Sequence, residues 1–260
     1  MCAPHFQSVT DYGTSKTIDM SAHRSLLIDG YIAYMLSPKG AEILLTCLLK
    51  TDLHKIQPTF EGNKVLCRSS ALSHLSPLSA GQSSSVWLLD YLADVSVGTV
   101  VPQPPPAPTN RGDFQRHVAN APLQMPIYFV HSDGRPGVPL VHAAAGSFPV
   151  VTGLDQEAPM GGRTTTHFCM NWPGYGEFKK QVEIQDSHHN PITIGRLIHR
   201  VANFIDAFIQ DRSTSPSAQT LWRLGGPGGV TREEILIVGV LQVSAGTWMP
   251  ILQLTRHVGF

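Results

Sequence analysis

The segment TTTHFCMNWPGYGEFKKQVEIQ, residues 164–185, decides the fold of the second half of the chain. Large apolar side chains alternate with polar ones on both sides of residues 173–176, as in two half-buried strands. The Pro-Gly-Tyr-Gly sequence between them supplies glycines that accept the positive φ of a tight turn. We therefore predict a β-hairpin here.

The clearest helical pattern in the chain follows this hairpin. Thr193 is a suitable N-cap, and apolar residues recur after it at steps of three and four: Ile194, Leu197, Ile198, Val201, Ile205 and Phe208. Residues 235–243 and 248–254 then predict two more strands. An amphipathic helix buries its apolar face against a sheet. The predicted fold class is α+β, with a hairpin, a long helix and a second hairpin in a mixed or antiparallel sheet.

The first half of the chain is less regular. Apolar residues predict helices over 26–36 and 41–50 and a short strand over 63–68, and residues 86–92 form a short apolar segment. Five prolines between residues 102 and 108 favour polyproline II and exclude a helix there. We therefore predict three parts: a mainly helical and loop-rich N-terminal part (1–101), a Pro-rich linker (102–110) and an α+β domain (111–260).

Charge and targeting signals bound the function. The 260 residues contain 19 Lys and Arg against 19 Asp and Glu, which argues against a protein that coats nucleic acid or anionic lipid with its whole surface. A local basic patch remains compatible with this balance.

The N-terminus lacks the basic and apolar regions of a signal peptide, and no apolar run approaches the about 20 residues of a membrane helix. The four cysteines form no C-x-x-C pair, as in a reducing compartment. We expect a cytoplasmic protein without a membrane partner.

Aromatic and cationic residues in and after the hairpin predict a binding surface. The turn would expose Trp172 and Tyr175, whose rings could stack on a base or a sugar. The alternative is that Trp172 packs into the core and Tyr175 only fills the turn. The cations expected to contact phosphates lie on the second strand and on the polar face of the helix: Lys179, Lys180, Arg196 and Arg200.

A carboxylate, an imidazole and a guanidinium near the same hairpin predict catalytic groups. Removing a base from RNA needs a cation or acid for the leaving base and a carboxylate that stabilises the oxocarbenium and orients water. We assign Arg163 or His167 to the first role and Glu177 to the second. This chemistry needs no metal and no cofactor. His188 and His189 are adjacent, so their Cβ vectors diverge, and whether they bind a metal stays open.

The strings NWPGY (171–175), FKKQVEI (178–184) and NPIT (190–193) resemble proteins of mushroom-forming fungi, the Agaricomycetes, over residues 125–210. The resemblance implies a fungal, intracellular protein, similar to the edodin-like ribosome-inactivating toxins. Such a toxin would be an adenine N-glycosylase that acts on ribosomal RNA and inhibits translation, with RNA or the ribosome as its partner. The chain lacks the Glu-x-x-Arg signature of plant-type toxins, so its site would be built differently.

Two other functions fit the same residues. The protein could be a non-enzymatic, glycan- or protein-binding module of a fruiting body, in which Trp172 and Tyr175 stack on sugar or peptide. It could also be a small-molecule enzyme that uses the loop of His131 and Asp133 or that of His188 and His189. The sequence does not predict an oligomeric state.

Overall fold

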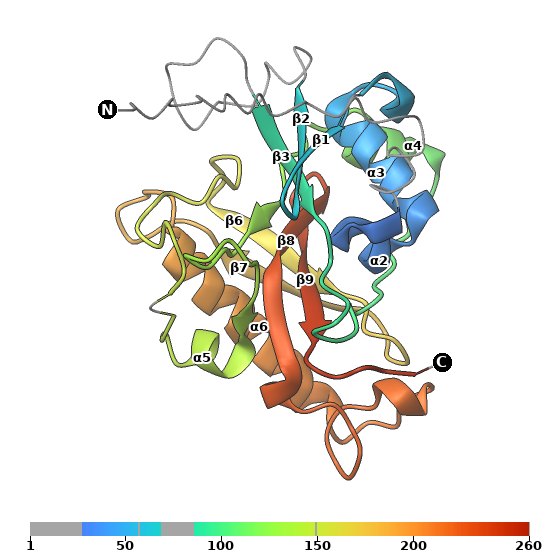
Figure 1. Cartoon of the computed structure of the whole chain (residues 1–260), viewed down its shortest axis with the longest axis vertical. Coiled ribbons are helices and arrows are strands. Elements are labelled where there is room, and N and C mark those ends of the chain that lie inside the picture. The colour runs from blue at the N-terminus through green and yellow to red at the C-terminus, as the bar shows by residue number, and fades with distance from the viewer. Residues whose placement is uncertain (1–27, 57, 69–85, 149, 260) are drawn as a thin grey trace, which may run out of the picture.

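The computed structural model describes residues 28–56, 58–68, 86–148 and 150–259 (Figure 1). Its larger sheet has six strands in the order β4-β8-β9-β6-β7, with β5 paired to β8. Only β6 and β9 run parallel, and the other pairs are antiparallel. The α+β class and the mixed sheet are therefore confirmed. The strands of this sheet are β4 (Ile127–Tyr128), β5 (Val138–Pro139), β6 (Thr165–Met170), β7 (Phe178–Glu183), β8 (Ile235–Ser244) and β9 (Thr247–Leu254).

One face of this sheet is covered by the long helix α6 (Ile194–Arg212) and the short helix α5 (Leu140–Ala144). The hydroxyl of Thr193 accepts a hydrogen bond from the N–H of Arg196, so the predicted N-cap is confirmed. All residues of the predicted apolar stripe except Ile194 are buried, and they share a core cluster with Phe168 of β6 and Trp248 of β9.

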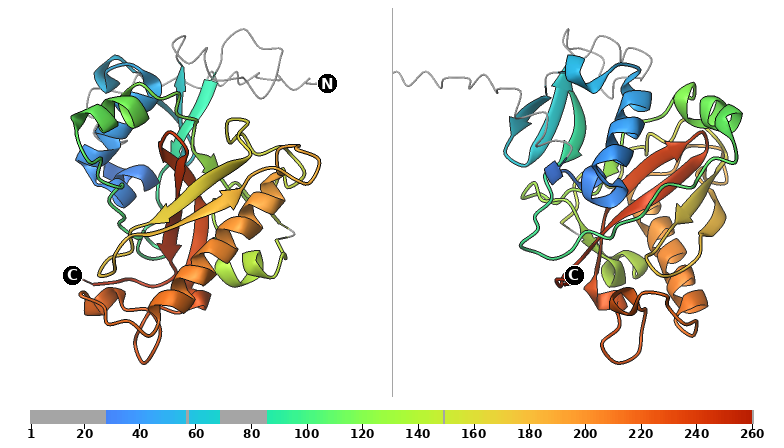
Figure 2. Two further views of the ribbon diagram at one scale, coloured as in Figure 1. Left: turned by 180° about the vertical axis from the view of Figure 1, so that it is seen from behind. Right: turned by 90° about the vertical axis from the view of Figure 1, so that its right-hand side faces the viewer.

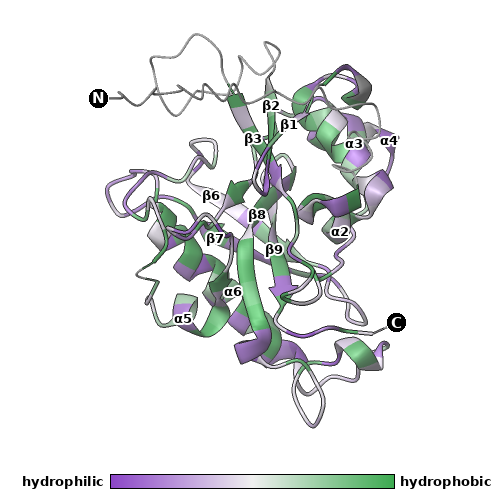
Figure 3. Cartoon of the chain, viewed as in Figure 1, coloured by the Kyte–Doolittle hydropathy of each residue, from purple (hydrophilic) through white to green (hydrophobic). Residues whose placement is uncertain are grey.

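The opposite face is covered by α2 (Tyr31–Leu36) and α3 (Pro38–Leu49). In the side view of Figure 2, these two helices and α6 lie on opposite sides of β8 and β9. Strand β9 is buried over its whole length, because Trp248 and Leu252 face α6 while Met249 and Ile251 join the cluster of α2 and α3. Burial on both faces explains why β8 is almost continuously apolar (Figure 3).

The N-terminal part also contains a small antiparallel sheet, in the order β1-β2-β3. The expectation of a mainly helical and loop-rich part included one short strand here, over 63–68, which corresponds to the second of the three. The sequence pattern did not reveal the other two as strands. Its strands are β1 (Pro58–Glu61), β2 (Lys64–Arg68) and β3 (Val86–Tyr91), and a 3-10 turn, η1 (Leu53–Lys55), precedes them. Residues from both sides of the predicted boundary, including Leu45 and Met249, pack into one core cluster. The division into domains stays a prediction.

The Pro-rich segment lies against the larger sheet. Val101 donates its N–H to the carbonyl of Leu252 (2.9 Å), and the buried amide of Gln103 donates to the carbonyl of Pro250 (2.8 Å). Further along, the Asn171 amide donates to the carbonyl of Pro104 (2.7 Å). The last two bonds tie the predicted linker to β9 and to the residue that follows β6. It leads into α4 (Arg111–Phe114) and a π-helical turn, η3 (Gln115–Ala119).

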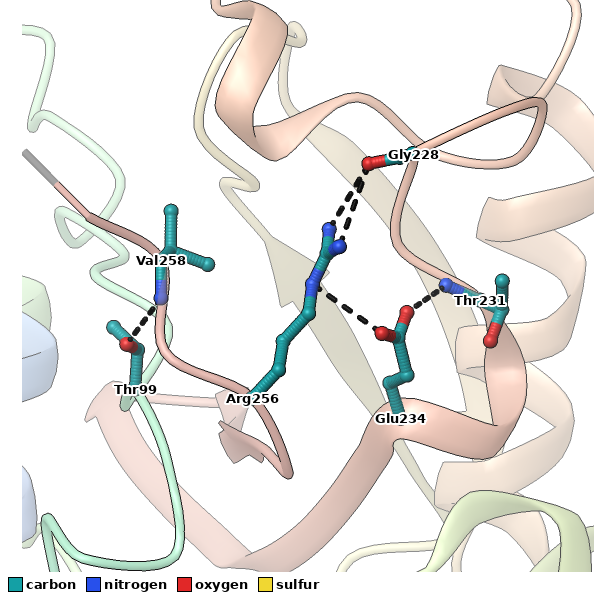
Figure 4. A network of polar contacts seen from close by, with 6 residues as sticks. All are labelled: Thr99, Gly228, Thr231, Glu234, Arg256 and Val258. Atoms are coloured by element: carbon teal, nitrogen blue, oxygen red, sulfur yellow. Dashed lines mark hydrogen bonds and ion pairs between the residues drawn. The ribbon is translucent and has the colours of Figure 1, made fainter.

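A polar network anchors the C-terminal tail and the glycine-rich loop 225–229 (Figure 4). Arg256 pairs through Nε with Glu234 Oε1 at 3.3 Å, and its guanidinium also donates to the carbonyl of Gly228. Glu234 caps the short turn η5 (Arg232–Glu234), which follows η4 (Thr220–Trp222). The N–H of Val258 donates to Thr99 Oγ1 at 2.9 Å. Within the described ranges, no helix is long and apolar enough to cross a membrane.

Candidate functional site

An open cleft of about 560 Å³ lies on the face of β6 that is turned away from α6. We call it the polar cleft. It is formed by the Pro-rich segment, by α4 with η3, by the start of β6, by β7 and by the turn between β8 and β9. Its lining residues are Pro106, Ala107, Pro108, Thr109, Asp113, His117, Val118, Arg163, Thr165, Thr166, His167, Lys179, Ser244, Ala245, Gly246 and Thr247. Three of the residues predicted from sequence, Arg163, His167 and Lys179, therefore line one site.

The turn between β8 and β9 holds two walls of the polar cleft together. The N–H of Ala245 donates to the carbonyl of His117 at 2.7 Å, which fixes η3 to the turn. The carbonyl of the next residue, Gly246, accepts from the N–H of His167 and from the hydroxyl of Thr166, both at 3.0 Å. The segment that carries His117 is thus bonded to Ala245, and the segment that carries His167 is bonded to the next residue of the same turn, Gly246.

Arg163 lies directly against this turn. Gly246 has φ +91°, and a Cβ built on it would come within 2.7 Å of an Arg163 guanidinium nitrogen. A side chain at this position would therefore displace the guanidinium. The absence of a Cβ at Gly246 is what lets Arg163 occupy this end of the cleft.

Lys179 reaches the cleft from β7 because of the register of the hairpin. His167 pairs with Gln181 and Cys169 pairs with Lys179, so these four side chains share one face of the hairpin. Lys179 is the diagonal neighbour of His167 on that face, at a typical separation of about 7–8 Å between backbones. The ammonium and the imidazole thus border the same space.

Asp113 is the carboxylate among the cleft-lining residues. Its N–H donates to Asn110 Oδ1 at 2.9 Å, and its Oδ2 accepts from the Asn110 amide at 3.0 Å. This reciprocal pair caps α4 and holds the carboxylate at the first turn. Two cations, Arg163 and Lys179, therefore face one carboxylate that already has a partner, so the lining carries a net positive charge with its histidines neutral.

Glu177 lies outside the lining of the polar cleft, next to the buried thiol of Cys169. Burial, together with the charge and hydrogen bond of Glu177, raises the pKa of Cys169 to about 12, while Lys179 opposes the change. The predicted catalytic carboxylate, just before the start of β7, is thus not among the residues that line the cleft with Arg163 and His167. If the cleft uses a carboxylate, Asp113 is the one that lines it.

The prediction that Trp172 is exposed is wrong. Its side chain is 1% exposed, and its indole N–H donates to the carbonyl of Trp222 at 2.8 Å. The ring packs between Trp222 and Phe208 at centroid distances of 6.1 Å. The segment that carries η4 covers the hairpin turn, so a residue expected at an exposed tip becomes part of the core. Trp172 has no surface on which a ligand could stack.

Tyr175 is half-buried and has a similar structural role. Its ring meets Phe208 edge-on at a centroid distance of 6.1 Å. Its hydroxyl accepts a 3.0 Å hydrogen bond from the N–H of Leu224, which holds the chain that follows η4. The expected stacking platform is therefore absent from this turn, and the alternative of a packed turn describes both aromatic residues.

The remaining predicted cations lie away from the polar cleft. Lys180 points to the α6 side of the hairpin, where its ammonium lies 5.1 Å from the centroid of the Phe178 ring. Arg200 of α6 donates to the main-chain carbonyl of Glu183, and Arg196 is exposed in the first turn of α6. The six predicted binding residues thus divide into two buried or half-buried aromatics, one cleft lysine and three cations near α6.

The two histidine loops show turn geometry. Asp186 Oδ1 accepts from the N–H of His188 at 2.8 Å and from that of Asn190 at 2.9 Å. Asp133 is paired with Arg135 at 2.7 Å, and this hydrogen bond lowers the pKa of the carboxyl. Among the residues that the structure describes, no group of three His, Cys, Asp or Glu side chains is close enough to hold a metal ion.

Sequence reasoning missed His117 and Asp113. Both lie just after the Pro-rich segment, in RGDFQRH (111–117). The local sequence signal here is for the start of a helix, from Asn110 as N-cap with Asp113 in the first turn. Nothing in this heptapeptide indicates that it lies against a turn more than a hundred residues further along the chain. No protein-family profile, curated protein or solved structure matches this chain.

Proposed function

We propose that this protein acts on RNA and that the polar cleft holds the sugar–phosphate backbone of its substrate. The observation that carries this proposal is that Arg163, His167, Lys179 and His117 line one cleft. Guanidinium and ammonium groups are the usual protein partners of phosphate oxygens. Hydroxyls from Thr109, Thr165 and Ser244 line the same space and suit the hydroxyls of a ribose.

The shape of the site supports a polymeric substrate. Arg163, His167, Lys179 and His117 are all exposed, so their charged and polar ends reach an open cleft and not an enclosed cavity. A chain with a net charge of zero cannot hold RNA through a general positive field. Binding should therefore be local, with few phosphate contacts and a shallow dependence on salt.

We further propose, from the resemblance described above, that the substrate is ribosomal RNA and that the protein is a translation-inhibiting toxin of the fungal cytoplasm. Adenine N-glycosylase activity would require a group that assists the leaving base and a carboxylate. Arg163 or His167 would serve the first role in the cleft, and Asp113 would replace Glu177 in the second.

The test is an incubation of the protein with mammalian ribosomes, followed by analysis of the ribosomal RNA with and without aniline. Removal of a base gives one fragment that appears only after aniline, and cleavage of the chain gives a fragment without it. Arg163→Ala combined with Lys179→Ala should abolish either product. The matched control is Lys180→Ala, a lysine on the neighbouring position of β7 that points to the α6 side. Ribosomes that stay intact and translate normally would refute the proposal.

The glycan-binding alternative has less support. It assigned ligand stacking to Trp172 and Tyr175, and these rings pack against Phe208 and Trp222. A glycan array is a useful counter-test for the cleft, because binding of a neutral glycan that is lost in Arg163→Ala would favour a carbohydrate ligand over RNA.

A further inference from the structure

We infer that His117 and His167 are an acid–base pair that cleaves the RNA chain, with the ribose 2′-hydroxyl as nucleophile. This inference rests on the proposed function and specifies its reaction. It assigns catalysis to His117, which lies outside the hairpin that carries His167 and Lys179.

The backbone attaches both histidine-bearing segments to one turn. His117 is bonded through its carbonyl to the N–H of Ala245 at 2.7 Å, and His167 is bonded through its N–H to the carbonyl of Gly246 at 3.0 Å. Both side chains line the polar cleft and are exposed to it. Two imidazoles that flank one phosphate are suited to removing a proton on one side and donating a proton on the other.

The cations complete this arrangement. Arg163 lies against Gly246, the residue to which His167 is attached, and Lys179 is the diagonal neighbour of His167 on the hairpin. Cleavage of a phosphodiester builds negative charge on the non-bridging oxygens of phosphorus. Fixed guanidinium and ammonium groups beside those oxygens stabilise that charge.

The reaction balances without an added reagent. One neutral imidazole takes the proton of the 2′-hydroxyl as the 2′-oxygen forms a bond to phosphorus. The bond between phosphorus and the 5′-oxygen of the next nucleotide breaks, and the second, protonated imidazole gives its proton to that oxygen. The products are a 2′,3′-cyclic phosphate and a free 5′-hydroxyl, and the net charge of the imidazole pair is unchanged.

The cleft is less suited to removing a base. Excision enzymes hold the extruded base between aromatic or apolar side chains. The described lining residues include no Phe, Tyr or Trp, and the Asp113 carboxylate already accepts from Asn110. Cleavage of the chain needs neither an aromatic pair nor a free carboxylate, so the observed side chains favour it.

The experiment uses the full chain, a labelled oligoribonucleotide and the same oligonucleotide with 2′-O-methyl groups. We expect the first to be cut to products with a cyclic phosphate and a 5′-hydroxyl, and the second to be bound but left intact. His117→Ala and His167→Ala should each slow cleavage by at least about 100-fold. Their affinity for the 2′-O-methyl oligonucleotide should change little, because the phosphate contacts of Arg163 and Lys179 remain.

His188→Ala is the matched control, since His188 is an exposed histidine in a loop outside the cleft, and it should cleave like the unmodified protein. His117→Asn and His167→Asn are second variants in case an alanine variant does not fold. Binding without cleavage by the unmodified protein, or undiminished cleavage by the histidine variants, would overturn this inference and leave the proposed function standing. Release of free base from an uncut strand would overturn it in favour of an N-glycosylase. Failure to bind either oligonucleotide would overturn both.

Discussion

The hydroxyl of Tyr128 donates a hydrogen bond to Asp90 Oδ1, which joins β4 of the large sheet to β3 of the small one in the interior of the protein. Asp90 also accepts from the N–H of Tyr91 at 2.7 Å and from that of Ile32 at 3.1 Å. Burial nevertheless raises the pKa of this carboxyl to about 7, because these hydrogen bonds only partly offset the loss of water.

Asp90 should make the protein less stable as the pH rises from about 4 to about 7. Across this window the folded protein keeps a proton that the unfolded chain has lost, so the free energy of unfolding falls by about 1 kcal/mol per pH unit. Below the window both states are protonated, and above it both are ionised. Asp90→Asn should remove this contribution. Urea unfolding at several pH values measures it, with the exposed Asp133→Asn as a control that keeps it. An unchanged slope in Asp90→Asn would contradict the prediction.

Trp172→Ala should destabilise the protein by about 3–5 kcal/mol, because it removes a large buried ring and a hydrogen bond to the carbonyl of Trp222. Denaturant unfolding gives this difference. Trp172→Phe, which keeps most of the ring volume, should cost less. If Trp172→Ala weakened RNA binding without lowering the unfolding midpoint, the ring would have to be an exposed ligand contact.

Gly246→Ala should weaken RNA binding by about tenfold, because the new methyl group displaces the guanidinium of Arg163. It should also cost about 1 kcal/mol of stability, since alanine is strained at a positive φ. Gly134→Ala separates the two effects. Gly134 has φ +84° but has nothing within 4 Å of the position of its Cβ, so this variant should lose stability alone. Equal binding by the two variants would mean that Arg163 does not contact the RNA.

Lys50→Met should loosen the wall of the cleft that carries His117. The Lys50 ammonium donates to the carbonyls of Ala119, the last residue of η3, and Ala121, just after it, at 2.6 and 2.8 Å. We expect faster amide hydrogen exchange in residues 115–121 and a loss of about 1 kcal/mol in the free energy of unfolding. Lys39→Met, a lysine at the start of α3, should leave this exchange unchanged. Exchange in 115–121 that is the same in both variants would show that Lys50 does not hold η3.

The sequence predicts the second half of the fold well because its signals are local. Alternation along residues 164–185 predicts β6 and β7, and the three- and four-residue steps after Thr193 predict α6 with its cap. The short β1, by contrast, has no such pattern. It forms because β2 offers an antiparallel edge, which a local pattern does not contain.

The candidate site was only partly predictable for the same reason. Alternation places His167 and Lys179 on one face of the hairpin and Lys180 on the other. It does not indicate which face receives the Pro-rich segment and η3, and which receives α6. That choice brings His117 to the histidine of the hairpin and leaves Glu177 beside Cys169.

The sequence by itself therefore determined the fold class, the hairpin, the amphipathic helix and the residues that share each face of a strand. Tertiary structure alone decided that Trp172 is buried, that Arg163, His167 and Lys179 meet His117 in one cleft, and that the other cations lie elsewhere. The physical reason is that backbone periodicity fixes the direction of each side chain relative to its own strand or helix. What covers that side chain is decided by the packing of segments distant in the chain, such as η3 against the turn of Ala245 and Gly246.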